Sequence, residues 1–202
     1  MITASGIFRF LHLASTALLF GCFAFYCLVS RPALARAGAS AAAEFAAFDR
    51  RQRRFARWML LAVFLTGMIS FWLQVSAVSG TSFLAALHPS AMADVLLGTR
   101  YGLVWSVRLV LLLFLEFILN RLEGGDSPPA RLLGFLCAAL LTVAPVFSGH
   151  AAAGVGIWLL IQLAVGATHL FFASLWLGGL GTFADEVATE ASTVEDTGTV
   201  DQ

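Results

Sequence analysis

Two histidines lie deep inside apolar segments, and the residues that follow them repeat. After each of them, His12 and His169, leucine stands one and six positions later and glycine stands nine positions later. A hydrocarbon environment disfavours an ionisable side chain by roughly a few kcal/mol or more, so such a histidine usually faces a bundle interior, a cavity, a metal or a cofactor. Imidazole is a ligand for copper, zinc and haem iron. We therefore expect function at these two positions.

The other two histidines extend the set of candidate metal ligands. His150 follows an apolar segment in FSGHAAAG, and His88 lies in the 79–97 loop, which we place on the same side of the membrane. Together with His12 and His169, they predict an imidazole-lined route from outside into the bundle. Each histidine has an alternative role as a partner in an interhelical hydrogen bond. Four histidines do not by themselves identify the metal.

Arg108 is a further ionisable residue within an apolar segment, GTRYGLVWSVRLVLL. Either the Arg108 side chain snorkels, so that its guanidinium lies at the outer membrane interface, or the guanidinium provides a functional positive charge inside the bundle. That charge would face an anionic group of a cofactor or tune the potential of a metal site.

The sequence contains no catalytic constellation. There is no Ser/His/Asp set on polar loops, no glycine-rich phosphate loop after a strand and no carboxylate pair within the apolar segments. We therefore expect a protein that is not an enzyme.

The composition indicates an all-α, polytopic membrane protein. Of 202 residues, 59% are apolar and 12% are charged, which does not suit the surface of a soluble domain. About 20 apolar residues are needed to cross a bilayer as a helix. Five segments meet this requirement, and because a lipid-exposed sheet edge leaves its backbone unsatisfied, we predict five transmembrane helices. These are residues 7–29, 58–78, 102–119, 132–148 and 155–180.

The arginines predict the topology. Seven of the twelve lie between Arg31 and Arg57, so the positive-inside rule places the 30–57 loop in the cytoplasm. The N-terminus is then periplasmic and the C-terminus cytoplasmic. This basic cluster adjoins a membrane span, so we interpret it as a topology signal that contacts lipid headgroups and not as a nucleic-acid site.

Two connecting segments carry predictions of their own. The helix formers in the 30–57 loop are expected to extend the second span into the cytoplasm, and the 79–97 loop is expected to form short interfacial helices. The chain divides into a transmembrane domain, residues 1–183, and a tail, residues 184–202. Six acidic residues and no basic ones predict that this tail is disordered and cytoplasmic.

The repeat around the two histidines also predicts packing. The first and fifth spans run in the same direction, and a small residue, Ala17 or Ser174, lies four positions before the glycine, Gly21 or Gly178. This small-xxx-small pattern lets helices approach closely. Nine residues turn a helix by about 900°, so the glycine faces away from the histidine. One face should pack while the other presents imidazole.

These motifs resemble the copper resistance protein D (CopD) family of bacterial inner-membrane proteins. The resemblance rests on a T-x-aromatic-G-x-x-W-x-x-R pattern, a later GHA and then H-x6-W-x-G-G, in that order. The first pattern comprises Thr99, Tyr101, Gly102, Trp105 and Arg108.

Membership would imply copper handling, commonly copper uptake across the inner membrane beside a periplasmic copper-binding partner of the CopC type. By position, the resemblance gives His12, His150 and His169 as copper ligands and assigns no role to Trp105 or Arg108. Fuller members of the family continue with further spans after the last motif. A complete path in this chain would then require a homodimer or a partner.

Two further classes of function stay open at this point. Histidines on separate helices also ligate haem in membrane b-type cytochromes, with an arginine beside a propionate, so haem b is the alternative cofactor to copper. A scaffold for another membrane complex would need neither group. The leading hypothesis is a copper transport or copper resistance protein, with Met68 and Cys22 as softer ligands further along the path.

Overall fold

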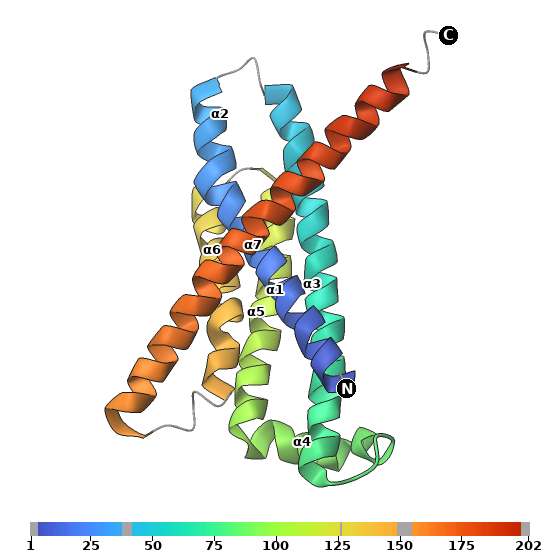
Figure 1. Ribbon diagram of the computed structural model, residues 1–202, viewed down its shortest axis with the longest axis vertical. Coiled ribbons are helices and arrows are strands. Elements are labelled where there is room, and N and C mark those ends of the chain that lie inside the picture. Colours follow the sequence, from blue (N-terminus) through green and yellow to red (C-terminus); the bar gives the residue numbers. More distant parts are fainter. Residues whose placement is uncertain (1–3, 38–41, 126, 149–154, 199–202) are drawn as a thin grey trace.

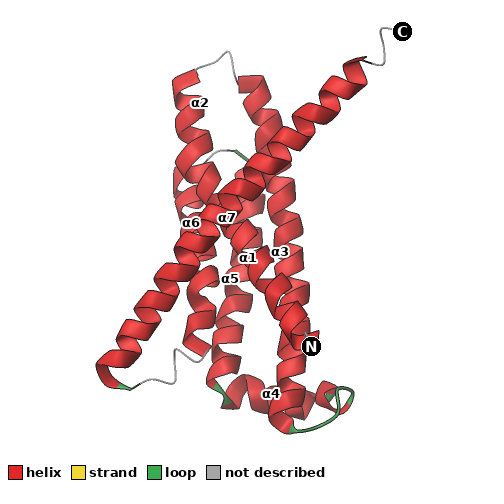
Figure 2. Ribbon diagram, in the orientation of Figure 1, coloured by secondary structure: helices red, strands yellow, loops and turns green. Residues whose placement is uncertain are grey.

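The computed structural model describes residues 4–37, 42–125, 127–148 and 155–198, and within these ranges it contains helices and no β-strand (Figure 2). Five helical segments are long and apolar enough to cross a membrane, which confirms the predicted number of spans. The elements that form them are α1 (Ala4–Phe25) with its continuation, α3 (Ala42–Ser79), α5 (Arg100–Glu123), α6 (Pro128–Val143) with η4 (Ala144–Ser148), and α7 (Gly156–Gly198). The chain is thus a multi-pass membrane protein.

Helix α1 lies at the centre of the bundle. It packs against α3, α6 and α7, and more than half of its most apolar window is buried, whereas none of the corresponding window of α7 is. Figure 1 shows α7 crossing over α1 on one side of the bundle. The two copies of the repeat therefore sit in different surroundings, one enclosed and one peripheral.

The crossing of α1 and α7 depends on two glycines. A Cβ added at Gly21 would collide with the backbone of Gly178, and one added at Gly178 would collide with the backbone of Gly21. Ala17 and Ser174, four residues earlier in each helix, are also buried. Both helices run from the same end of the bundle (Figure 1), so the glycine faces of the parallel repeat pack as predicted.

The first span continues beyond its α-helix through a wide turn. A π-helical turn, η1 (Tyr26–Ser30), joins α1 to α2 (Arg31–Ala37), which contains Pro32. Proline has no N–H to donate to the carbonyl four residues earlier and its ring clashes there, so a widened turn before it accommodates the ring.

An ion cluster around the buried carboxylate of Asp49 joins this extension to α3. The carboxylate of Asp49 accepts from Arg53 Nη1 at 2.5 Å and from Arg31 Nη2 at 3.3 Å, and Arg31 also donates to the Tyr26 hydroxyl.

Helix α3 begins at Ala42, which confirms that the 30–57 segment extends the second span.

The predicted short helices of the 79–97 loop are present as η3 (Ala85–Leu87) and α4 (Pro89–Gly98). Helix α7 continues to Gly198, so its backbone is helical into the acidic segment. Adding residues to an existing helix avoids the cost of nucleation. The division into a transmembrane domain and a tail stays a prediction.

The glycine crossing gives a matched pair of substitutions. We expect Gly178→Ala to lower the free energy of unfolding by about 1–3 kcal/mol, because a methyl group cannot be inserted without separating α1 from α7. Gly179→Ala should be neutral or slightly stabilising, because a Cβ there meets no atom within 4 Å and alanine favours the helix. Reversible unfolding in mixed SDS and maltoside micelles measures both. Equal effects of the two changes would contradict the proposed close approach.

Candidate functional site

His12 is held inside the bundle by a hydroxyl group from α3. Its side chain is buried, and its Nδ1 lies 3.0 Å from the Thr66 hydroxyl oxygen. That hydroxyl donates its own proton to the Ala62 carbonyl at 2.6 Å, so it accepts from the imidazole. The hydrogen bonds therefore assign the ring proton to Nδ1.

The second ring nitrogen faces the guanidinium of Arg108 from α5. Arg108 Nη2 is hydrogen-bonded to His12 Nε2, and because a guanidinium has only donors, Nε2 must accept. The imidazole is thus neutral, and both of its nitrogens are occupied. Three helices meet at this one ring.

A cavity of about 280 Å³ opens beside this contact. Its lining includes residues from the N-terminal halves of α1 and α5, and both helices begin at the same end of the bundle (Figure 1). Among the described residues, the lining contains two cationic side chains and no carboxylate: Arg9, His12, Leu13, Gly67, Ser70, Tyr101, Trp105, Arg108, Pro145 and Ser148. A small molecule or ion entering from this end therefore reaches His12 and Arg108.

Glycine in α3 makes room for the imidazole. A Cβ on Gly67 would lie 3.1 Å from His12 Cε1, closer than ordinary van der Waals contact. The carbonyl of the same residue lies 3.4 Å from the indole nitrogen of Trp105. The absence of a side chain at this position sets both the depth of the histidine and its distance from α5.

The structure explains the spacing of the T-x-aromatic-G-x-x-W-x-x-R pattern. Thr99 caps α5 by accepting from the Gly102 N–H at 2.9 Å, and Gly102 packs directly against the α4 backbone, where a Cβ would collide with it. Tyr101, Trp105 and Arg108 then follow at helical spacings of four and three, which places them on one face. All three line the cavity.

The remaining predicted ligands are not gathered around His12 in the described part of the chain. His88 is exposed in the loop before α4, with its Nδ1 2.8 Å from the Ser90 hydroxyl oxygen, and His169 is exposed on α7. His150 lies outside the described residues. Among those that are described, no group of three or more His, Cys, Asp or Glu side chains is placed to hold a metal ion. Their assignment as copper ligands stays a prediction.

Three residues of the site were missed by sequence reasoning: Thr66, Ser70 and Arg9. Arg9 precedes His12 by three residues, so helical spacing places it on the same face of the first span. Thr66 and Ser70 stand four residues apart and share a face of the second span in the same way. That spacing does not give the helix against which the face packs, so it could not join them to His12.

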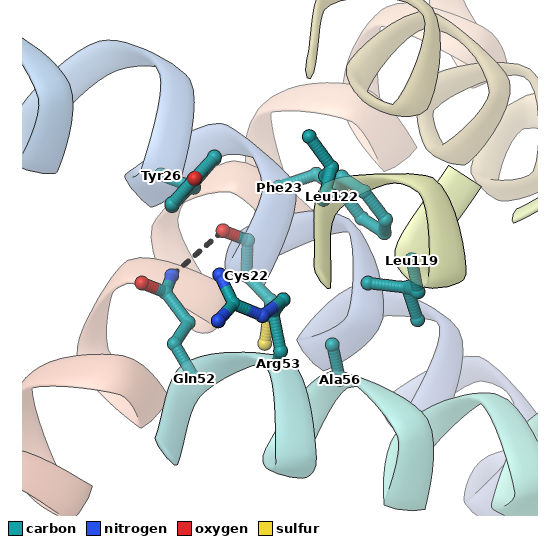
Figure 3. Close-up of a pocket in the computed structure, with 8 residues that line it drawn as sticks. All are labelled: Cys22, Phe23, Tyr26, Gln52, Arg53, Ala56, Leu119 and Leu122. Carbon is teal, nitrogen blue, oxygen red and sulfur yellow. Dashed lines mark hydrogen bonds between the residues drawn. The ribbon is translucent and has the colours of Figure 1, made fainter. Parts of the chain in front are cut away.

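A smaller pocket lies towards the opposite end of the bundle. Figure 3 shows Gln52 from α3 and Cys22 from α1 facing each other, with the Gln52 amide donating to the Cys22 carbonyl at 2.8 Å. Its volume of about 20 Å³ is sufficient for roughly one water molecule. The cavity beside His12 is the larger of these two sites and has the greater number of polar side chains.

The contact between His12 and Arg108 can be tested by a double-mutant cycle. We expect His12→Leu to lower the free energy of unfolding by about 1–3 kcal/mol, because the guanidinium loses its acceptor inside the bundle. Adding Arg108→Leu should restore part of that loss, since no buried charge is then left. The measurement is unfolding in mixed micelles.

The control for this cycle combines His12→Leu with Arg54→Leu, a change at an exposed arginine. These two losses should add, because the residues share no contact. Additive losses for His12→Leu and Arg108→Leu as well would show that the two side chains do not depend on each other.

Comparison with known proteins identifies one family. The family model described as "Copper resistance protein D-like, N-terminal domain" matches residues 1–161. No curated protein and no solved structure matches the chain.

Proposed function

The chain belongs to the copper resistance protein D-like family, a family of copper resistance membrane proteins, and we propose that it binds and passes copper through the membrane with His12 as a ligand. In this proposal copper is the cargo, and the chain is a transfer protein and not an enzyme. The single observation that carries it is the burial of His12 at a cavity that opens towards one end of the bundle.

The hydrogen bonds of His12 suit a metal ligand. Thr66 holds the proton on Nδ1, which leaves the lone pair of Nε2 directed at Arg108. Copper would bind this lone pair only after the guanidinium leaves it. Arg108 is a long side chain that no carboxylate holds in the described part of the chain, so we propose that it exchanges with copper at Nε2.

The other histidines take roles at the two ends of this path. We propose that His88 and His150 receive copper at the mouth of the bundle, where a periplasmic partner of the CopC type would deliver it. His169 faces away from the bundle on α7, so it serves a path only if a second copy of the chain or another partner covers that face. The proposed location is a bacterial inner membrane.

The haem alternative has no support. Of the histidines in the described ranges, His12 alone is buried, whereas a haem held by two histidines needs both rings inside the bundle.

Cellular copper tests the role of His12. In bacteria expressing the protein, we expect His12→Ala to shift copper accumulation to the level of cells with an empty vector, because the ligand in the bundle is gone. The control Leu11→Ala changes the neighbouring, exposed residue and should behave as the unchanged protein. Copper is measured by mass spectrometry at matched protein levels.

Purified protein provides the complementary measurement. We expect bound copper in the unchanged protein, less copper in His12→Ala, and no Soret band in the visible spectrum. The proposal fails if the purified protein takes up no copper and His12→Ala leaves cellular accumulation unchanged. A Soret band would favour the haem alternative instead.

The proposed topology is tested by thiol labelling in intact cells. With the three native cysteines replaced by alanine, Ser82→Cys should react with an impermeant maleimide, because the positive-inside rule places its loop in the periplasm. Arg50→Cys is the matched control, exposed at the opposite end of the bundle, and should react only after lysis. The reverse pattern would invert the topology and the direction in which the cavity opens.

A further inference from the structure

The cavity beside His12 has an uncompensated positive charge. Arg9 and Arg108 both line it, and its lining includes no aspartate or glutamate. The one acceptor that Arg108 has, the neutral imidazole of His12, supplies a hydrogen bond but no charge. A guanidinium taken out of water loses several kcal/mol of solvation, which a neutral partner only partly restores.

The arginines at the opposite end of the bundle are arranged differently. Arg31 and Arg53 pair with Asp49, and Arg57 pairs with Glu116 and Glu123. Within the described residues, the arginines that pair with a carboxylate thus lie at this end of the bundle, and the two arginines that line the cavity have no carboxylate partner.

Two donors at the cavity have no partner in the described structure. The Ser70 hydroxyl and the Arg108 Nε–H are both buried without a hydrogen-bond acceptor. A buried donor without an acceptor is destabilising, so these two groups, together with the unbalanced positive charge of the same cavity, point to a ligand that supplies acceptor atoms. The ligand must then carry oxygen or halide acceptors and a negative charge.

The position of Arg108 argues against a side chain that only reaches the interface. Arg108 follows the start of α5 by eight residues, or roughly 12 Å along the helix. Its guanidinium contacts His12, which is buried among α1, α3 and α5. If Arg108 only snorkelled to the membrane interface, its side chain would extend towards the end of the bundle and would make no hydrogen bond to His12.

We infer that this cavity is a binding site for an oxyanion, a phosphate or carboxylate group held by Arg108 and Arg9 with the Ser70 and Tyr101 hydroxyls. A guanidinium binds two oxygens of such a group side by side. The volume of about 280 Å³ accommodates a phosphate group or a small organic acid. Anion binding at this site does not require copper, because the positive charge and the two unpaired donors belong to the protein itself. The anion comes either from solution or from the phosphate of a phospholipid.

The first test is thermal unfolding in maltoside detergent, which carries no phosphate. Sodium phosphate is titrated against sodium chloride at constant ionic strength. A ligand that binds only the folded protein stabilises it in proportion to the logarithm of its concentration, so we expect Tm to rise by on the order of 5 °C at about a hundred times Kd. Fluorescence of Trp105, which lines the cavity, should change over the same range.

Matched variants separate the site from a general salt effect. Arg9→Gln and Ser70→Ala should each weaken phosphate binding about tenfold or more, as should Arg108→Gln. Arg100→Gln removes the same charge from an exposed residue at the same end of the bundle and should leave binding unchanged. We expect Arg9→Gln and Ser70→Ala to fold, because Arg9 is exposed and Ser70→Ala removes only a hydroxyl group. These two variants therefore test the site even if Arg108→Gln does not fold.

A second measurement distinguishes the two sources of the anion. A phospholipid that occupies the site should copurify with the unchanged protein and with Arg100→Gln, but be lost from Arg9→Gln and Ser70→Ala, as native mass spectrometry reports. Saturable phosphate binding to lipid-free protein instead assigns a soluble anion. The inference is overturned if the protein neither binds phosphate nor retains lipid, or if Arg9→Gln and Arg100→Gln behave alike. Copper is absent throughout, so failure here leaves the copper proposal untouched.

Discussion

A guanidinium among membrane helices requires acceptors inside the bundle, because the surrounding lipid supplies none. In this protein the acceptor is His12, and the geometry of the site follows from that contact. Thr66 fixes the ring from α3, Gly67 gives the ring room, and Thr99 sets where α5 begins and hence how deep Arg108 lies. One polar contact thus links α1, α3 and α5 at a defined depth and leaves a cavity beside it.

Because α1 is central and α7 is peripheral, the histidine of the repeated motif is buried in one copy and exposed in the other. In both copies the glycine and the histidine lie on opposite faces of a helix. Helix α1 has neighbours on both sides, so Gly21 packs against α7 while His12 is buried against α3 and α5. Helix α7 packs through Gly178, which leaves His169 exposed. The same residues therefore form an interior site in one helix and a surface in the other.

The two ends of the bundle differ in their electrostatics, and this difference bears on copper. At the basic end, the buried carboxylate of Asp49 neutralises Arg31 and Arg53. At the other end, Arg108 and Arg9 are not neutralised by any described carboxylate, and a cation there meets repulsion before it reaches His12. An anion in the cavity would remove that repulsion and draw Arg108 from the imidazole. A positively charged cavity and the cationic cargo that we propose are therefore compatible once a counter-ion is present.

The sequence by itself determined the five spans, the small-residue packing face of each repeat and the short helices before α5, because these follow from local hydropathy, small-residue spacing and turn residues. It also marked His12 and Arg108 as polar residues inside apolar segments. It did not determine that they contact each other, that His169 is exposed, or that Thr66, Ser70 and Arg9 join the site. Helical periodicity gives the face on which a residue lies but not the neighbour of that face. Only the packing of α1 between α7 and α3, with Arg108 of α5 at the ring, decided which imidazole was buried and what it contacted.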